Sequence, residues 1–168
     1  MALAAAAGFL LRPATPKNQP VRFSIPVPSG GSHGYGLALS PDGRWVAYES
    51  NAAGGSDTDI FVADFPHHAG QWQISYHGGY WPIWSGDGSQ IYFISGGHLM
   101  TVAVKPGATP QLSPPQALFP VNPPSDATES SPDYALLAGG REFLLDQVTG
   151  AKPVAINVVT HWTAALPH

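Results

Sequence analysis

The residues most able to do chemistry in this chain are its seven histidines, and His67, His68 and His77 form their densest group. Imidazole binds zinc well, but a zinc site needs several ligands that converge on one point. Neighbouring residues on a strand point to opposite faces, and no His-x-x-x-His pair or pair of carboxylates stands near these three. The pattern therefore favours solvated turn histidines, and we expect no metal site and no cofactor.

Nucleophilic catalysis is not expected either. The chain has no cysteine, which excludes a thiolate nucleophile and a thiolate metal site. A serine hydrolase places its nucleophile on a sharp turn between a strand and a helix, and we expect no such elbow here. The sequence thus predicts that the protein is not an enzyme.

Aromatic residues around residues 77–84 are the stronger candidates for recognition, because aromatic-lined concave surfaces are common ligand sites. These residues precede a turn motif that occurs twice. A similar group of residues precedes the earlier copy of the motif. Together the two groups give a predicted ligand-binding rim of five residues: His33, Tyr35, His77, Tyr80 and Trp81. The alternative is that Trp84, and either Tyr80 or Trp81, serve packing between structural repeats.

An internal repeat supplies the elements that would position this rim. Residues 39–48, which contain Ser40-Pro41-Asp42-Gly43, match residues 84–93 with a register of about 45 residues, and a degenerate third copy follows at residues 136–145. Proline presets φ at the first central turn position, aspartate accepts local hydrogen bonds, and glycine takes the positive φ that closes a hairpin. We therefore expect the aspartates of the motif to be structural. Residues 131–133 read Ser-Pro-Asp like the motif, but we do not expect them to form its turn.

Along the strands on either side of each turn, successive residues alternate between the two faces, and both faces are apolar. This is typical of sheets that lie between neighbouring sheets. Further strands are expected at residues 59–64 and 71–76, at 98–105 and 111–119, and at 134–138, 141–147 and 154–162. Four strands in a repeat of roughly 40–50 residues are typical of a β-propeller blade. The predicted fold is all-β, with about three four-stranded antiparallel blades that form an incomplete ring or half of an oligomeric ring. The rim would then lie at one mouth of the central channel.

The Ser-Pro-Asp-Gly turn, the aromatic strand after it and Asp59-Ile60-Phe61-Val62 resemble the WD40-like blades of TolB-type propellers. Residues 45–166 are similar to the C-terminal end of the extracytoplasmic propellers on bacterial receptor-type serine/threonine kinases. Residues 10–13 and 21–26 are similar to the membrane exit and first propeller strand of the same proteins. The resemblance implies a periplasmic or extracytoplasmic module, in which a segment before the blades tethers a longer parent protein to the membrane. The kinase motifs themselves are absent from this sequence.

Charge and composition limit the classes of partner that we expect. Net charge is -4, and the seven basic residues are scattered, so nucleic acid is not an expected partner. Residues 1–20 are expected to be an apolar N-terminal stub with a proline-rich linker, and residues 21–168 the blades. The apolar run at residues 2–11 is about half the length that spans a membrane. We interpret this run as a secretory signal, a frayed leader or the end of a longer membrane helix.

The predicted function is a non-catalytic binding or scaffold module for a protein or peptide partner. Two alternatives remain open: a sensor fragment of a receptor kinase, and the propeller part of a hydrolase. Three blades would leave two apolar faces exposed, and residues 21–27 form a spare strand. A homodimer that exchanges these strands could complete a ring of about six blades, within the usual range.

Overall fold

A computed structural model describes residues 33–52, 57–105, 107–122, 134–137, 140, 142–147 and 155–160 of the chain. Three predicted segments lie outside these residues: the stub and linker at residues 1–20, the strand at residues 21–27 and the Ser-Pro-Asp sequence at residues 131–133. Within them the protein is all-β, with several antiparallel sheets and no α-helix, as the sequence predicted. No helix among them could therefore cross a membrane.

Sheet 1 is a four-stranded antiparallel sheet in the order of the chain. Its strands are β1 (His33–Leu39), β2 (Trp45–Ser50), β3 (Asp59–Asp64) and β4 (Gln71–Gln73). Strand β4 is shorter than the predicted strand at residues 71–76. After Gln73 the chain bends toward sheet 2, and Ser75 bonds to the start of β3 through its side chain: its Oγ accepts from the Ile60 N–H at 2.8 Å.

Sheet 2 follows the same order and has a divided outer edge. Its strands are β5 (Tyr80–Trp84), β6 (Gln90–Ser95), β7 (His98–Lys105), β8 (Gln111–Leu112) and β9 (Gln116–Pro120). Both β8 and β9 pair with β7. The single strand predicted at residues 111–119 is therefore wrong, because Pro114 and Pro115 lack the N–H that a continuous ladder needs. Ser113 Oγ accepts from the Ala103 N–H at 2.9 Å at this interruption.

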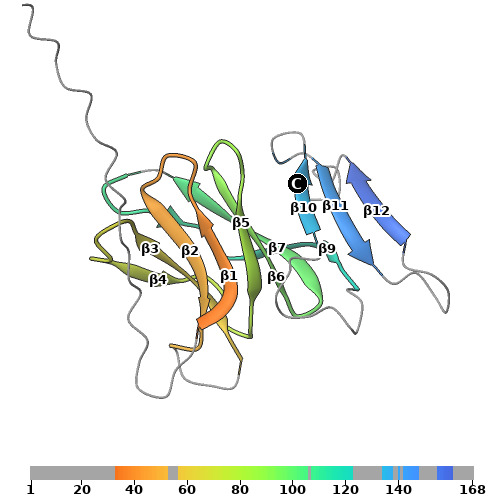
Figure 1. Cartoon of the computed structure of the whole chain (residues 1–168), viewed down its shortest axis with the longest axis horizontal. Coiled ribbons are helices and arrows are strands. Elements are labelled where there is room, and N and C mark those ends of the chain that lie inside the picture. Colours follow the sequence, from red (N-terminus) through yellow and green to blue (C-terminus); the bar gives the residue numbers. More distant parts are fainter. Residues whose placement is uncertain are drawn as a thin grey trace, which may run out of the picture.

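Sheet 3 has three described strands: β10 (Tyr134–Leu137), β11 (Glu142–Gln147) and β12 (Ala155–Thr160). Figure 1 shows the three sheets following one another across the molecule, with β1–β4 at one side and β10–β12 at the other. The inner strand β5 of sheet 2 lies beside β1 of sheet 1.

The repeated turn has the same hydrogen bonds in sheets 1 and 2. Ser40 Oγ donates to Asp42 Oδ1 at 2.7 Å and accepts from the Trp45 N–H at 2.9 Å. Ser85 Oγ does the same with Asp87 Oδ1, at 2.7 Å, and with the Gln90 N–H, at 2.9 Å. The prediction that both aspartates are structural is thus confirmed.

Glycine occupies one position of the turn in all three sheets. Gly43, Gly88 and Gly140 have φ values of 69°, 71° and 95°. In sheet 3 the turn lies between Leu137 and Glu142, which pair with each other. This placement confirms the third copy at Gly140, where the serine and aspartate of the motif are lost but the need for positive φ remains.

Two apolar cores hold neighbouring sheets together. The first contains Trp45, Ile60 and Val62 of sheet 1 with Trp84 and Phe93 of sheet 2. The second joins sheet 2 to sheet 3, and its buried aromatic members are Trp81, Tyr92, Tyr134 and Phe143. Because β6 contributes Phe93 to one core and Tyr92 to the other, sheet 2 is apolar on both faces, as predicted.

Gly43→Val and Gly88→Val are each expected to lower the free energy of unfolding by more than about 1 kcal/mol, because a β-branched residue is strained at positive φ. Lack of space is not the reason, since an added Cβ at Gly43 meets nothing within 4 Å. Gly86→Val is the matched control in the same turn, because Gly86 has open space and no positive φ. Urea unfolding of the three variants measures this, and equal losses at Gly86 and Gly88 would contradict it.

The turn also predicts a pH dependence. The hydrogen bond from Ser85, together with those from Ser89, lowers the pKa of Asp87 from 3.8 to about 2. A carboxyl group whose pKa is lower in the folded protein stabilises it above the unfolded pKa. This contribution is therefore lost as the pH falls from about 4 toward 2. Asp87→Asn should flatten the stability profile in that window, as measured by urea unfolding at a series of pH values; an unchanged slope would count against the turn assignment.

Candidate functional site

The five residues of the predicted rim do not share one environment. His33 and Tyr35 lie in β1, but their side chains are outside the described part of the structure. His77 is exposed in the loop before β5, and Tyr80 is partly buried at the start of that strand. Trp81 is only 7% exposed and belongs to the core between sheets 2 and 3.

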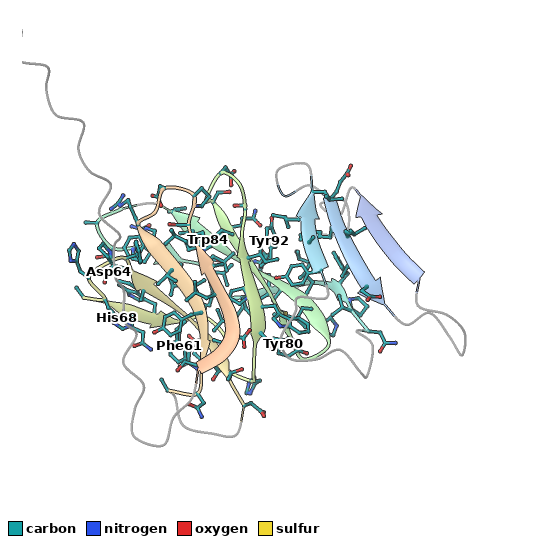
Figure 2. All side chains as sticks on the ribbon, in the orientation of Figure 1. Phe61, Asp64, His68, Tyr80, Trp84 and Tyr92 are labelled. Carbon is teal, nitrogen blue, oxygen red and sulfur yellow. The ribbon has the colours of Figure 1, made fainter. Side chains whose placement is uncertain are left out.

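Both tryptophans of β5 serve packing between sheets, which confirms the alternative interpretation for Trp84 and for one member of the Tyr80/Trp81 pair. Trp84 packs toward sheet 1, and its Nε1–H donates to the Ala38 carbonyl of β1 at 3.1 Å. Trp81 packs the other way, toward sheet 3, with its ring 5.0 Å from that of Tyr80 in an edge-to-face arrangement. Figure 2 shows Trp84, Tyr80 and Tyr92 around β5 and β6.

The loop that carries His77 is fixed by both flanking sheets. The Gly78 N–H donates to Asp59 Oδ1 at 3.1 Å, and the Gly79 N–H donates to the Thr58 carbonyl at 2.8 Å. From sheet 2, Ser95 Oγ donates to the Gly78 carbonyl at 2.6 Å. The start of β5 is therefore held in place before the strand begins, and Asp59 is a structural residue of this loop.

The backbone of Trp81 joins all three sheets. Its N–H donates to Glu49 Oε1 of β2 at 2.6 Å, and its carbonyl accepts from Tyr134 Oη of β10 at 2.6 Å. Trp81 has a φ of 56°, and the pairing of β5 with β6 shifts register between Tyr80 and Ile83. A bulge at Trp81 thus turns its backbone N–H and carbonyl away from their own ladder and toward the neighbouring sheets.

Sequence analysis missed Glu49, which is 4% exposed although it carries a carboxyl group. Two glycines of β1 make room for it: a Cβ at Gly34 or Gly36 would collide with its side chain. The signal was present in the sequence as an acidic residue in the apolar strand Trp45–Ser50, opposite a strand with two glycines. A buried carboxyl group of this kind is stable only with hydrogen-bond partners, and Trp81 supplies one.

Tyr134 was expected only as a strand residue, yet it is the contact from sheet 3. Burial, with Glu49 nearby, raises the pKa of its hydroxyl well above 10, so the group remains a donor. The hydroxyl is buried, and its bond to the Trp81 carbonyl links β10 to β5.

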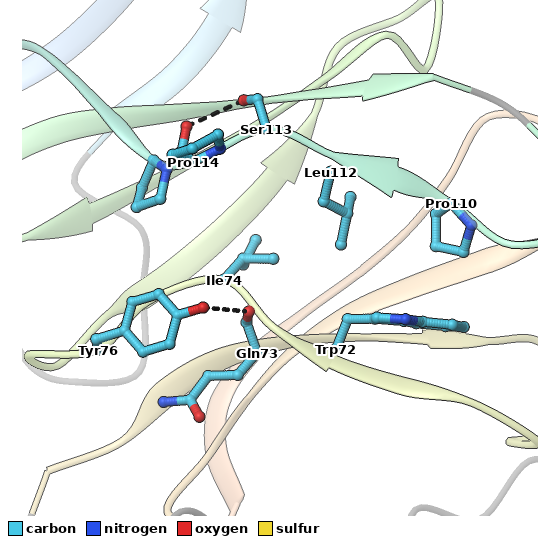
Figure 3. Close-up of a pocket in the computed structure, with 9 residues that line it drawn as sticks. Trp72, Gln73, Ile74, Tyr76, Pro110, Leu112, Ser113 and Pro114 are labelled. Atoms are coloured by element: carbon cyan, nitrogen blue, oxygen red, sulfur yellow. Dashed lines mark hydrogen bonds between the residues drawn. The ribbon is translucent and has the colours of Figure 1, made fainter.

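A groove lies between the outer strands of sheets 1 and 2. Its volume is about 450 Å³. Trp72, Gln73 and Tyr76 form one wall, and Leu112 with Pro114 forms the other, as Figure 3 shows. Ile74, Pro110, Ser113 and Pro115 complete the lining. None of these nine residues is charged.

Tyr76 is the most accessible aromatic group in this groove, at 63% exposed. Its hydroxyl lies 3.4 Å from the Gln73 carbonyl, a long contact that leaves the ring surface open. Trp72 contacts Trp45 edge to face at 5.7 Å, which fixes the indole in the wall. No local pattern in the sequence indicates this surface, because its two walls come from different repeats.

Metal-binding side chains do not cluster among the described residues. No group of three or more histidine, aspartate or glutamate side chains there could hold a metal ion. The letters Gly-x-Ser-x-Gly do occur once, at residues 30–34, which sequence analysis overlooked. This window leads into strand β1 instead of a helix, unlike a hydrolase elbow, and Ser32 lies outside the described residues.

Comparisons with known proteins identify no family. No family model matches this chain, and no curated protein matches it.

Tyr134→Phe is expected to lower the free energy of unfolding by about 1 kcal/mol or more, because it leaves the buried Trp81 carbonyl without this donor. Tyr76→Phe is the matched control, since its hydroxyl makes only the long, exposed contact to Gln73. Thermal and urea unfolding of both variants measures the difference. Equal stability of the two would show that the bond from Tyr134 does not hold sheet 3 to sheet 2.

Proposed function

We propose that this chain is a non-catalytic binding module made of three β-propeller-type blades, and that it binds an extended proline-rich peptide in the groove between the outer strands of sheets 1 and 2. The groove, with Trp72 and Tyr76 facing a proline-lined wall, is the observation that carries the proposal. The module has no catalytic role in this proposal.

The repeat supports the interpretation of the sheets as blades. Each sheet begins with an inner strand, a glycine turn and a second antiparallel strand, and each packs face to face on the next. Sheets 1 and 2 place two further strands outward from there. Blades of this kind gain stability by burying both faces, which agrees with the complete burial of the central residues of β2 and β6.

The chemistry of the groove favours an uncharged, extended ligand. Aromatic side chains beside shallow apolar pockets bind polyproline II segments, whose conformation is already restricted before binding. The absence of charge among the nine lining residues makes an acidic or basic peptide a poorer match. Next to the groove, β4 pairs only with β3 among the described strands, so its outer edge retains backbone donors and acceptors.

Two neighbouring residues separate this groove from the rim predicted by sequence. Tyr76 lines the groove, whereas His77 belongs to the predicted rim, and both are exposed. A fluorescein-labelled decamer of proline is the probe, and fluorescence polarisation measures its binding to the whole chain. Tyr76→Ala should weaken binding about tenfold, equal to roughly 1.4 kcal/mol, because an aromatic anchor is lost. His77→Ala should bind like the unchanged protein.

Two outcomes contradict the proposal. Loss of binding in His77→Ala with no effect of Tyr76→Ala would move the site to the rim. No binding of the decamer by the unchanged protein at any accessible concentration would remove proline-rich peptides as the ligand class. The extracytoplasmic location and the relation to receptor kinases remain predictions from the resemblance, and a kinase reading frame adjoining this one would support them.

A further inference from the structure

The outer strand of sheet 1 is more open to a partner than the middle of its outward face. On β2 and β3 this face, which points away from sheet 2, carries Val46, Tyr48, Phe61 and Ala63, which are only 0–5% exposed. The expectation that an end blade exposes its apolar face is therefore wrong for these residues. Strand β4 differs, because it pairs with β3 alone among the described strands and begins with the exposed Gln71.

Hydrogen bonds at the two ends of β4 show which of its backbone groups point to the outer edge. The Ile74 N–H donates to the Ile60 carbonyl at 2.8 Å, and the Asp64 N–H donates to the Gly70 carbonyl at 3.4 Å. Successive residues of an antiparallel strand direct their N–H and carbonyl groups alternately toward one neighbour and away from it. Positions 70, 72 and 74 therefore face β3, and positions 71 and 73 direct their backbone groups to the outer edge.

This edge presents two donors and one open acceptor. The donors are the N–H groups of Gln71 and Gln73, about 7 Å apart at the usual rise of a strand. The Gln73 carbonyl already accepts from the Tyr76 hydroxyl at 3.4 Å. No described residue donates to the Gln71 carbonyl. A ligand strand at this edge therefore needs two carbonyls but only one N–H.

The alternation of side chains decides where a proline of the ligand fits. Residues directly opposite each other in antiparallel strands share a face. A ligand residue opposite Trp72 therefore lies on the groove side of β4, where Leu112 and Pro114 form the other wall. Its N–H would point away from β4, so a proline loses no hydrogen bond there. The next ligand residue, opposite Gln71, must supply the N–H.

We infer that the groove binds its peptide as an added antiparallel strand of sheet 1, and that the peptide contains Pro-Xaa-Pro, with Xaa opposite Gln71 and carrying a backbone N–H. The inference rests on the proposed function and adds the sequence class of the ligand. The first proline lies between Trp72 and Leu112. The carbonyl of Xaa accepts from the Gln71 N–H, and the carbonyl two residues earlier accepts from the Gln73 N–H. Strand addition of this kind derives affinity from backbone bonds and specificity from alternate side chains.

Three capped, fluorescein-labelled decamers test this inference with the unchanged protein. One is decaproline, the second has alanine as its fifth residue, and the third has N-methylalanine there. The alanine peptide should bind about fivefold more tightly than decaproline, equal to roughly 1 kcal/mol, because it adds one hydrogen bond. The N-methylalanine peptide lacks the N–H and should bind like decaproline. Fluorescence polarisation measures the three affinities.

The peptide series separates failure of this inference from failure of the proposed function. Equal affinity for all three peptides would overturn the strand pairing and leave the proline-binding groove standing. Binding of the N-methylalanine peptide as tight as that of the alanine peptide would also overturn it, because the gain would not come from the N–H. If decaproline does not bind, the proposed function fails and this inference falls with it.

Two variants at one position test the protein side of the pairing. Gln71→Pro removes an N–H that faces outward, so it should weaken binding of the alanine peptide about fivefold and leave the ladder to β3 intact. Gln71→Ala is the matched control, since it keeps the backbone and removes only the exposed side chain. It should bind the alanine peptide like the unchanged protein. Urea unfolding of both variants checks that stability is retained.

Equal losses of affinity in the two variants would assign the contact to the Gln71 side chain and refute pairing through the backbone. Full affinity in a stable Gln71→Pro variant would refute it as well. If Gln71→Pro loses stability, the peptide series with the unchanged protein decides.

Discussion

The backbone of Trp81 is the point at which the three sheets meet. A left-handed conformation costs an ordinary residue about 1–2 kcal/mol. The buried hydrogen bonds to Glu49 and Tyr134, each worth about 1 kcal/mol or more, offset that cost. Because one bond comes from sheet 1 and the other from sheet 3, the strain in β5 is compensated only when all three sheets are assembled. The apolar cores supply most of the attraction, and the backbone of Trp81 fixes how the sheets are aligned.

The repeated turn makes that alignment possible. Its serine and aspartate close the hairpin with local bonds, so the register of each sheet does not depend on its neighbours. Within this register, Gly36 stands as far before Ser40 as Trp81 stands before Ser85. The two copies use the position in opposite ways. Gly36 provides the space that Glu49 fills, and Trp81 provides the N–H that Glu49 accepts.

Packing of the inner strands explains why the groove lies elsewhere. In β5 the indoles of Trp81 and Trp84 are committed to opposite neighbours, and the loop around Gly78 is bonded to both sheets. The outer strands are less constrained, because prolines interrupt the edge of sheet 2 and β4 is short. A groove between sheets can therefore remain open there with Tyr76 exposed.

The sequence alone determined the all-β class, the turns and their register, because these depend on local conformational preferences and on alternation along a strand. It also showed that sheet 2 is apolar on both faces. Only the tertiary structure decided what each aromatic residue does. The sequence pattern does not distinguish Trp81 from Tyr76, yet Trp81 is buried between sheets and Tyr76 lies in a groove. Glu49, Trp81 and Tyr134 come from three different sheets, and no local pattern encodes their meeting, because it depends on how separately formed sheets pack.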